Sequence, residues 1–190
     1  MLIANRQPDS QALVLACMLC LSSFAALAGD ILIESAQTRI ENGVLLLDAA
    51  SRFEFSDDAI DALNSGIGLV IELDLKIMRP RKYFWDRKVL KVHRTFKIER
   101  HALSKKFVVS DRVTGERHAH SELELAIAEL QDIKDLALFN TRADDFCDKC
   151  DAAFRLRLDL ESLPAPMIPL AYVSPSWHMS SGWYRWSIAR

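Results

Sequence analysis

The sequence contains few cysteines. Four occur among 190 residues, and Cys17 and Cys20 lie in an N-terminal segment that we expect to be removed. The remaining pair, Cys147 and Cys150, is too small a set for a domain that depends on disulfide bonds for its stability. The fold must therefore be stabilised by a hydrophobic core.

The sequence also lacks an excess of charge of either sign. It has 24 Lys and Arg residues against 26 Asp and Glu residues, which gives a formal net charge of −2 at pH 7. Nucleic-acid-binding domains normally carry a strong basic excess, because they neutralise phosphate groups. We therefore expect no nucleic-acid partner.

Recognisable catalytic motifs are missing as well. The chain contains no Gly-x-Ser-x-Gly, no His-Glu-x-x-His and no glycine-rich phosphate-binding loop. The adjacent acidic pairs Asp57-Asp58 and Asp144-Asp145 are weak candidates for proton transfer, because side chains of neighbouring residues usually point apart. The sequence predicts no catalytic residue, no resident metal and no cofactor, and it gives no support for an enzyme.

Residues 1–28 are typical of a secretory signal peptide. A weakly basic start at Arg6 precedes the apolar segment 12–26, and Ala26-Leu27-Ala28 has the small residues that signal peptidase requires. We predict cleavage after Ala28 and a single periplasmic domain over residues 29–190. An uncleaved anchor is the first alternative, but it needs ~20 apolar residues. A lipoprotein is the second, but only a short apolar run precedes Cys17.

Alternation of apolar and polar residues with a period of two dominates the rest of the chain, as in strands with one buried face. Asn42-Gly43 predicts a hairpin turn between strands at 31–40 and 44–55. The clearest strand is 69–79, in which Glu72, Asp74 and Lys76 face away from the apolar side. Further strands are expected at 85–99, 103–109, 154–160 and 177–188.

Two short helices are expected. Ser56 is placed to cap the first, which Gly66 ends. Ser121 and Glu124 form a capping-box pattern at the start of the second, which runs to about Leu130. About seven antiparallel strands with two short helices predict a mainly β fold, either an antiparallel β-sandwich or a strongly curved sheet. No βαβ alternation supports a parallel sheet.

A basic and aromatic segment joins the strands at 69–79 and 85–99. Cationic side chains beside aromatic rings can contact an acidic partner, a glycan phosphate or anionic lipid headgroups. The alternative is a solvated hairpin whose rings fold back into the core. The candidate binding residues are Arg79, Arg81, Lys82, Trp85, Arg87 and Lys88.

Cys147 and Cys150 form a Cys-x-x-Cys pair, for which a local disulfide is the expected state in an oxidising compartment. Redox exchange is one alternative, although the thioredoxin-like βαβ context is missing. Zinc binding is another, with His118 and His120 as possible further ligands, but the spacing matches no standard finger. Solvated histidines are the favoured interpretation.

Two further features need a structure for their interpretation. Four rings gather near the C-terminus, either as core packing or as a ligand platform: Trp177, Trp183, Tyr184 and Trp186. Arg94 falls on the inward-facing side of its strand. A buried arginine must be paired, so either an inward acid meets it or the edge of that strand is open.

Several short motifs occur in a characteristic order. They are Ala62-Leu63 with Gly66-Ile67, Arg79-x-Arg81, Trp85-Asp86, the helix at 121–130, Arg157-Leu158-Asp159, Leu163-Pro164-x-Pro166, and Trp177 with Ser180-Ser181-x-Trp183. In this order the chain resembles the proteobacterial exported domain-of-unknown-function family 4390 over residues 31–186. The resemblance implies an envelope protein and hints at two-component envelope signalling. It brings no activity, catalytic residue or cofactor.

These observations favour a non-catalytic envelope module that binds a protein or a membrane surface, with no transmembrane segment after signal cleavage. The first alternative is a periplasmic thiol-redox or metal-dependent protein that uses Cys147 and Cys150. The second is a carrier of an apolar ligand between two sheets.

Overall fold

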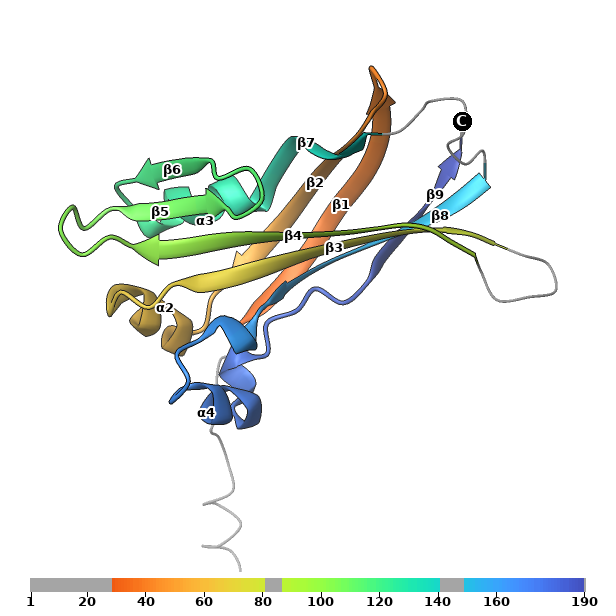
Figure 1. Ribbon diagram of the computed structural model, residues 1–190. Helices are drawn as coiled ribbons and strands as arrows, with labels where there is room; N and C mark the ends of the chain where they lie inside the picture. The colour runs from red at the N-terminus through yellow and green to blue at the C-terminus, as the bar shows by residue number, and fades with distance from the viewer. Residues whose placement is uncertain (1–28, 81–86, 141–148, 190) are drawn as a thin grey trace, which may run out of the picture.

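The computed structural model describes residues 29–80, 87–140 and 149–189. Within these ranges, nine strands form two antiparallel sheets that face each other (Figure 1). The predicted mainly β, sandwich-like fold is thus confirmed. No helix in the described ranges combines the length and apolarity needed to cross a membrane.

The smaller sheet has three strands. Its order is β1 (Asp30–Glu41), β2 (Val44–Glu54) and β7 (Asp132–Asn140). The predicted hairpin turn joins β1 to β2, with positive φ angles of 50° at Asn42 and 76° at Gly43. Positive φ at both central residues is what the tight hairpin turn requires, which explains the Asn-Gly sequence.

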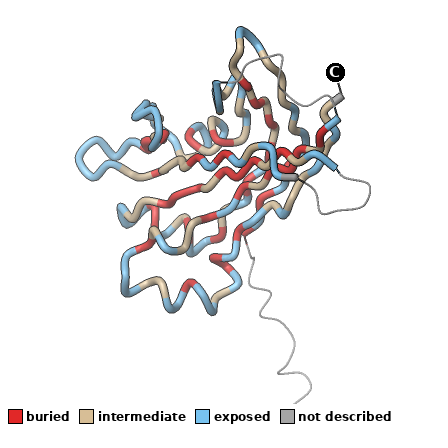
Figure 2. The backbone as a smooth tube through the Cα atoms, turned by 45° about the vertical axis from the view of Figure 1, so that its right-hand side comes forward, coloured by how far each residue is buried: buried red, intermediate tan, exposed pale blue. Residues whose placement is uncertain are grey.

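The larger sheet has six strands, with β3 (Leu69–Arg79) inside it. Its order is β6 (Arg117–His120), β5 (Phe107–Asp111), β4 (Arg87–Arg100), β3, β8 (Lys149–Leu158) and β9 (Tyr184–Ala189). The alternating apolar residues of β3 point into the space between the sheets and are at most 1% exposed: Leu69, Ile71, Leu73, Leu75 and Ile77. Figure 2 shows buried residues concentrated along these strands.

Three α-helices lie in the described part of the chain. Ser56 caps α2 (Asp57–Asn64) as predicted, since its hydroxyl accepts a hydrogen bond from the Ala59 amide at 3.3 Å. The predicted capping box of α3 (Leu123–Gln131) is wrong, because Glu122 is the N-cap and no side chain bonds to the free amides. The chain is still extended at His120, so the helix starts later than its sequence pattern indicates. The third helix, α4 (Ile168–Val173), was not expected from the pattern of prolines.

The structure also has strands that the sequence pattern does not reveal. β6 has the sequence Arg-His-Ala-His and lies at the edge of its sheet. Its side chains are not buried in the core, so the sequence shows no alternation of apolar and polar residues there. β7 follows α3 directly, without a glycine or proline between them to mark the boundary. Near the C-terminus, by contrast, the predicted strand 177–188 begins only at Tyr184, after the short 3₁₀ helix η3 (Pro175–Trp177).

Arg94 is paired inside the protein, by the first of the two routes expected from the sequence. It is 9% exposed, and its guanidinium lies 3.5 Å from the carboxylate of Asp111, which is 8% exposed. It also donates to the Ala137 carbonyl at 2.5 Å, across to the smaller sheet. The Asp111 carboxylate accepts a second bond from the amide of Val113 at 2.7 Å. The pair therefore ties β4 to β5 and β7.

We predict that Asp111→Ala lowers the free energy of unfolding by about 3 kcal/mol, because it leaves a buried arginine without its counter-ion. Urea denaturation of the purified protein measures this change. The exposed neighbour Arg112→Ala is the matched control and should shift stability by less than about 0.5 kcal/mol. Equal effects of both variants would contradict the role given to the pair.

Candidate functional site

The outer face of the six-stranded sheet carries a row of charged side chains centred on Asp74. This residue faces away from the core, as predicted, yet it is only 5% exposed. Its neighbours across the two strand pairings are His93 on β4 and Arg155 on β8. His93 Nδ1 lies 3.0 Å from Asp74 Oδ1, and Arg155 donates to Oδ2 at 2.7 Å. Asp74 therefore connects three strands.

The same contacts set the protonation of Asp74. Burial by itself raises the pKa of its carboxyl group, but the hydrogen bonds and charges of Arg155 and His93 outweigh burial and lower the pKa below the usual 3.8. The carboxylate is thus held in its charged form at neutral pH. An ionised carboxylate has no proton to donate, so Asp74 is poorly suited to act as a general acid near pH 7.

Trp183 lies beside this row of charges. The Lys76 ammonium is 3.9 Å from its ring centroid and the Arg155 guanidinium is 4.5 Å away. Both contacts are favourable, because the face of an indole ring attracts cations. The preceding Ser181 exchanges hydrogen bonds with Leu156 of β8, at 2.9 Å and 3.0 Å, which fixes the segment against the strand. Trp183 is therefore a positioned part of the outer face.

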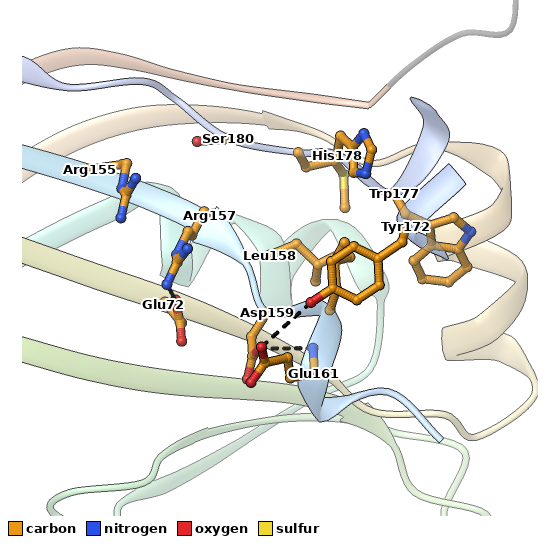
Figure 3. A pocket seen from close by; sticks show the side chains of 12 residues that line it. Glu72, Arg155, Arg157, Leu158, Asp159, Glu161, Tyr172, Trp177, His178 and Ser180 are labelled. Carbon is orange, nitrogen blue, oxygen red and sulfur yellow. Dashed lines mark hydrogen bonds and ion pairs between the residues drawn. The ribbon is translucent and has the colours of Figure 1, made fainter. Parts of the chain in front are cut away.

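Next to Trp183 the outer face is hollowed into an open groove of about 360 Å³. Glu72 and Arg157 form an ion pair on its floor, and Figure 3 shows both side chains beside the segment that follows η3. The Tyr172 hydroxyl donates to Glu161 at 3.5 Å at the other end. The groove is lined by Glu72, Arg155, Arg157, Leu158, Asp159, Leu160, Glu161, Tyr172, Trp177, His178, Met179 and Ser180.

The four C-terminal rings have different roles. Trp177 is 4% exposed, belongs to the core and also lines the groove. Tyr184 and Trp186 pack against the core from β9, with ring centroids 6.0 Å apart. Trp183 contacts two cations, Lys76 and Arg155. Core packing thus accounts for three rings, and Trp183 belongs to the outer face.

The predicted basic segment begins at the last residue of β3 and extends into the first residues of β4. Arg79 and Lys88 are exposed, with Arg79 paired to Arg87 and Lys88 paired to Met78. Arg81, Lys82 and Trp85 lie outside the described residues, as does the side chain of Arg87. The binding role of the segment therefore stays a prediction.

The cysteine pair is only half described. Cys150 lies in β8 and is 1% exposed, whereas Cys147 lies outside the described residues. The local disulfide between them therefore stays a prediction.

His118 and His120 lie on one side of β6, where they meet Glu129 of α3. Nδ1 of His118 is 2.6 Å from one carboxylate oxygen, and Nε2 of His120 is 2.5 Å from the other. The expectation of solvated histidines is thus incomplete, because both have an acidic partner. In the described ranges no set of three or more His, Cys, Asp or Glu residues is arranged to hold a metal ion.

Sequence reasoning identified the outward face of β3 but not the groove. Glu72, Asp74 and Lys76 were predicted to face outward, whereas their partners come from β4, β8 and the segment before β9. One signal was available, because two of the ordered motifs meet here: Arg157-Leu158-Asp159, and Trp177 with Ser180-Ser181-x-Trp183.

The sequence profile of the family described as Domain of unknown function (DUF4390) matches residues 28–187. The chain belongs to this family. The resemblance drawn from the ordered motifs is thereby confirmed. No curated protein and no solved structure matches the chain. The groove and the charges around Asp74 lie within the matched range, so they are part of the family domain.

We predict that Asp74→Asn lowers the free energy of unfolding at pH 7 by about 2 kcal/mol, through loss of charged hydrogen bonds. The pKa of Asp74 is lower in the folded protein than in the unfolded chain, where it is about 3.8. Asp74 therefore stabilises the fold above pH 3.8, and this stabilisation is lost as pH falls through the pKa of the folded protein. Urea denaturation at a series of pH values should show the wild-type and variant curves converging in acid. Exposed Asp61→Asn is the control, and parallel curves for Asp74→Asn would contradict this assignment.

Glu129 should control the titration of His118. Its hydrogen bond, followed by its charge, raises the pKa of His118 above 6.5. The His118–Glu129 contact therefore stabilises the fold below pH 6.5, and this stabilisation is lost as pH rises through the pKa of His118 in the folded protein. We predict that Glu129→Gln returns the His118 pKa toward 6.5, measured by NMR titration of the imidazole protons. Exposed Glu124→Gln on the same helix should leave it raised, and an unchanged His118 pKa in Glu129→Gln would refute the pairing.

Proposed function

We propose that the protein is an exported, non-catalytic binding module of the cell envelope, and that an extended polar segment of a partner protein lies in the groove beside β8. The observation that carries this proposal is the state of the charged groups in and beside the groove. They are fixed by pairing with one another, as in Glu72 with Arg157 and Asp74 with Arg155, while one side remains open. Charges that are preorganised in this way, with the Arg157 side chain 44% exposed, favour recognition.

The backbone beside the groove favours recognition through side chains. The β8 edge at Leu156 and Leu158 is already hydrogen-bonded to the segment 179–181, by contacts of 2.9 Å to Ser181 and Met179. A partner therefore gains little from pairing with β8 as an additional strand. Arg157, with 44% of its side chain exposed, and the exposed His178 and Ser180 are the groups that a partner meets first.

Export and an envelope location are supported by the signal-peptide pattern of residues 1–28. The link to two-component envelope signalling comes from the resemblance, and it makes the extracytoplasmic part of a sensor the first partner to test.

The two alternative functions receive less support. Thiol exchange needs an accessible thiolate, and Cys150 is 1% exposed. An apolar carrier needs a ligand-sized cavity, typically ~300 Å³ or more. A cavity that lies between the sheets near Phe53 and Phe96, within the described residues, has a volume of about 40 Å³.

We predict that Ser180→Trp, which fills the groove from an exposed position, reduces partner binding at least about tenfold, equivalent to about 1.4 kcal/mol. The measurement is site-specific photocrosslinking in intact cells from His178, with the crosslinked product quantified in wild type and variant. The melting temperature should be unchanged.

The matched control is Val113→Trp, at a side chain that is 60% exposed in the β5–β6 turn. It should leave the crosslinked product unchanged. A product of equal yield in Ser180→Trp, or a photocrosslinker at Val113 that gives the same product, would exclude the groove as the binding site.

A further inference from the structure

Beside Trp183, the outer face of the larger sheet carries three cations in one row across its strands. Lys76 on β3 is paired directly with Lys91 on β4, and on its other side with Ala153 on β8. Ala153 is in turn paired with Arg185 on β9. Strand partners share a face of the sheet, and strands lie ~4.8 Å apart, so the row spans about 14 Å. Lys76, Lys91 and Arg185 are called the cationic row.

The cations of this row differ from those of the groove, because they have no acidic partner. In the groove, Arg155 is paired with Asp74. Arg157 is likewise paired with Glu72. In the part of the chain that the structure describes, no carboxylate forms an ion pair with a member of the cationic row. The groove is therefore close to neutral, whereas the row carries uncompensated positive charge.

The Lys76–Lys91 pair is unfavourable for the fold. Like charges placed directly opposite each other on antiparallel strands destabilise a sheet. The Trp183 ring, 3.9 Å from the Lys76 ammonium, offsets one of the two charges, while Lys91 and Arg185 are exposed. This concentration of positive charge does not follow from the composition, since the chain has a net charge of −2. A bound anion would relieve the repulsion, so the row indicates an anionic ligand.

The cationic row continues the groove along β8. Figure 3 shows Arg155 at one end of the groove and Tyr172 at the other. The next outward-facing residue of β8 beyond Arg155 is Ala153, which is small and has a cation of the row on each side. A polypeptide segment that extends from the groove past Arg155 therefore passes between these cations.

We propose that the partner segment in the groove continues over the cationic row, and that the part lying there is acidic, with Asp or Glu side chains bound to Lys76, Lys91 and Arg185. This inference rests on the proposed function and deepens it, because it gives the chemistry and the direction of the segment. The groove takes the polar part, since its own cations are already neutralised. Attraction between the acidic part and the row accelerates association and weakens as salt is raised.

The test is fluorescence anisotropy of labelled peptide probes mixed with the purified protein. The acidic probe is a peptide of alternating Glu and Ser residues, and the neutral probe has Gln in place of every Glu. We expect the acidic probe to bind at least about tenfold more tightly, equivalent to about 1.4 kcal/mol. Its binding should weaken with salt. Lys91→Glu combined with Arg185→Glu should remove the preference.

Lys106→Glu combined with Arg112→Glu is the matched control, because both side chains are exposed elsewhere on the surface and the change in net charge is the same. It should bind the acidic probe as wild type does. Lys91→Glu alone should raise the melting temperature, since it places a carboxylate opposite Lys76. Weaker binding in the double variant would therefore not be caused by unfolding.

Equal binding of the two probes to the wild type, or an equal loss of binding in the control variant, would overturn the proposal. Wild-type binding to phosphatidylglycerol vesicles but not to the acidic probe would also overturn it, in favour of a lipid headgroup. The photocrosslink from His178 separates this inference from the proposed function. A product that is lost in Ser180→Trp but kept in the Lys91→Glu, Arg185→Glu variant would leave the groove as the binding site and exclude the acidic extension. A product that Ser180→Trp leaves unchanged would exclude the groove itself.

Discussion

The structure depends on the two-faced alternation of β3. Its apolar residues fill the space between the sheets, and its outward residues Glu72, Asp74 and Lys76 meet charged or aromatic partners. A register slip of one residue would place the three charges in the core and expose the apolar residues. Both faces of the strand therefore enforce one register against β4 and β8.

That register assembles the site. Antiparallel pairing places His93 and Arg155 on either side of Asp74, so a nearly buried carboxylate gains two partners without any loop rearrangement. The groove arises because β9 pairs with β8 only up to Phe154. Beyond that point, the irregular segment after η3 follows the strand and leaves room for solvent.

The two ends of β3 carry surfaces of opposite character. One end carries Arg79 beside Lys88 of β4, and the other lies near α2 and the uncharged segment around α4. The groove runs along the outer face between them.

The sequence by itself determined the features that depend on local chemistry. The alternation of apolar and polar residues identified β3. Asn42-Gly43 identified the first hairpin and Ser56 identified the start of α2, because each feature depends on neighbours in the chain. The edge strand β6, the junction of α3 with β7, and the helix α4 were decided by tertiary packing, since their residues carry no periodic apolar signal or boundary residue. The partners of Asp74 and Trp183 were likewise decided only by the tertiary structure, because strand pairing brings together charges that lie far apart in the chain.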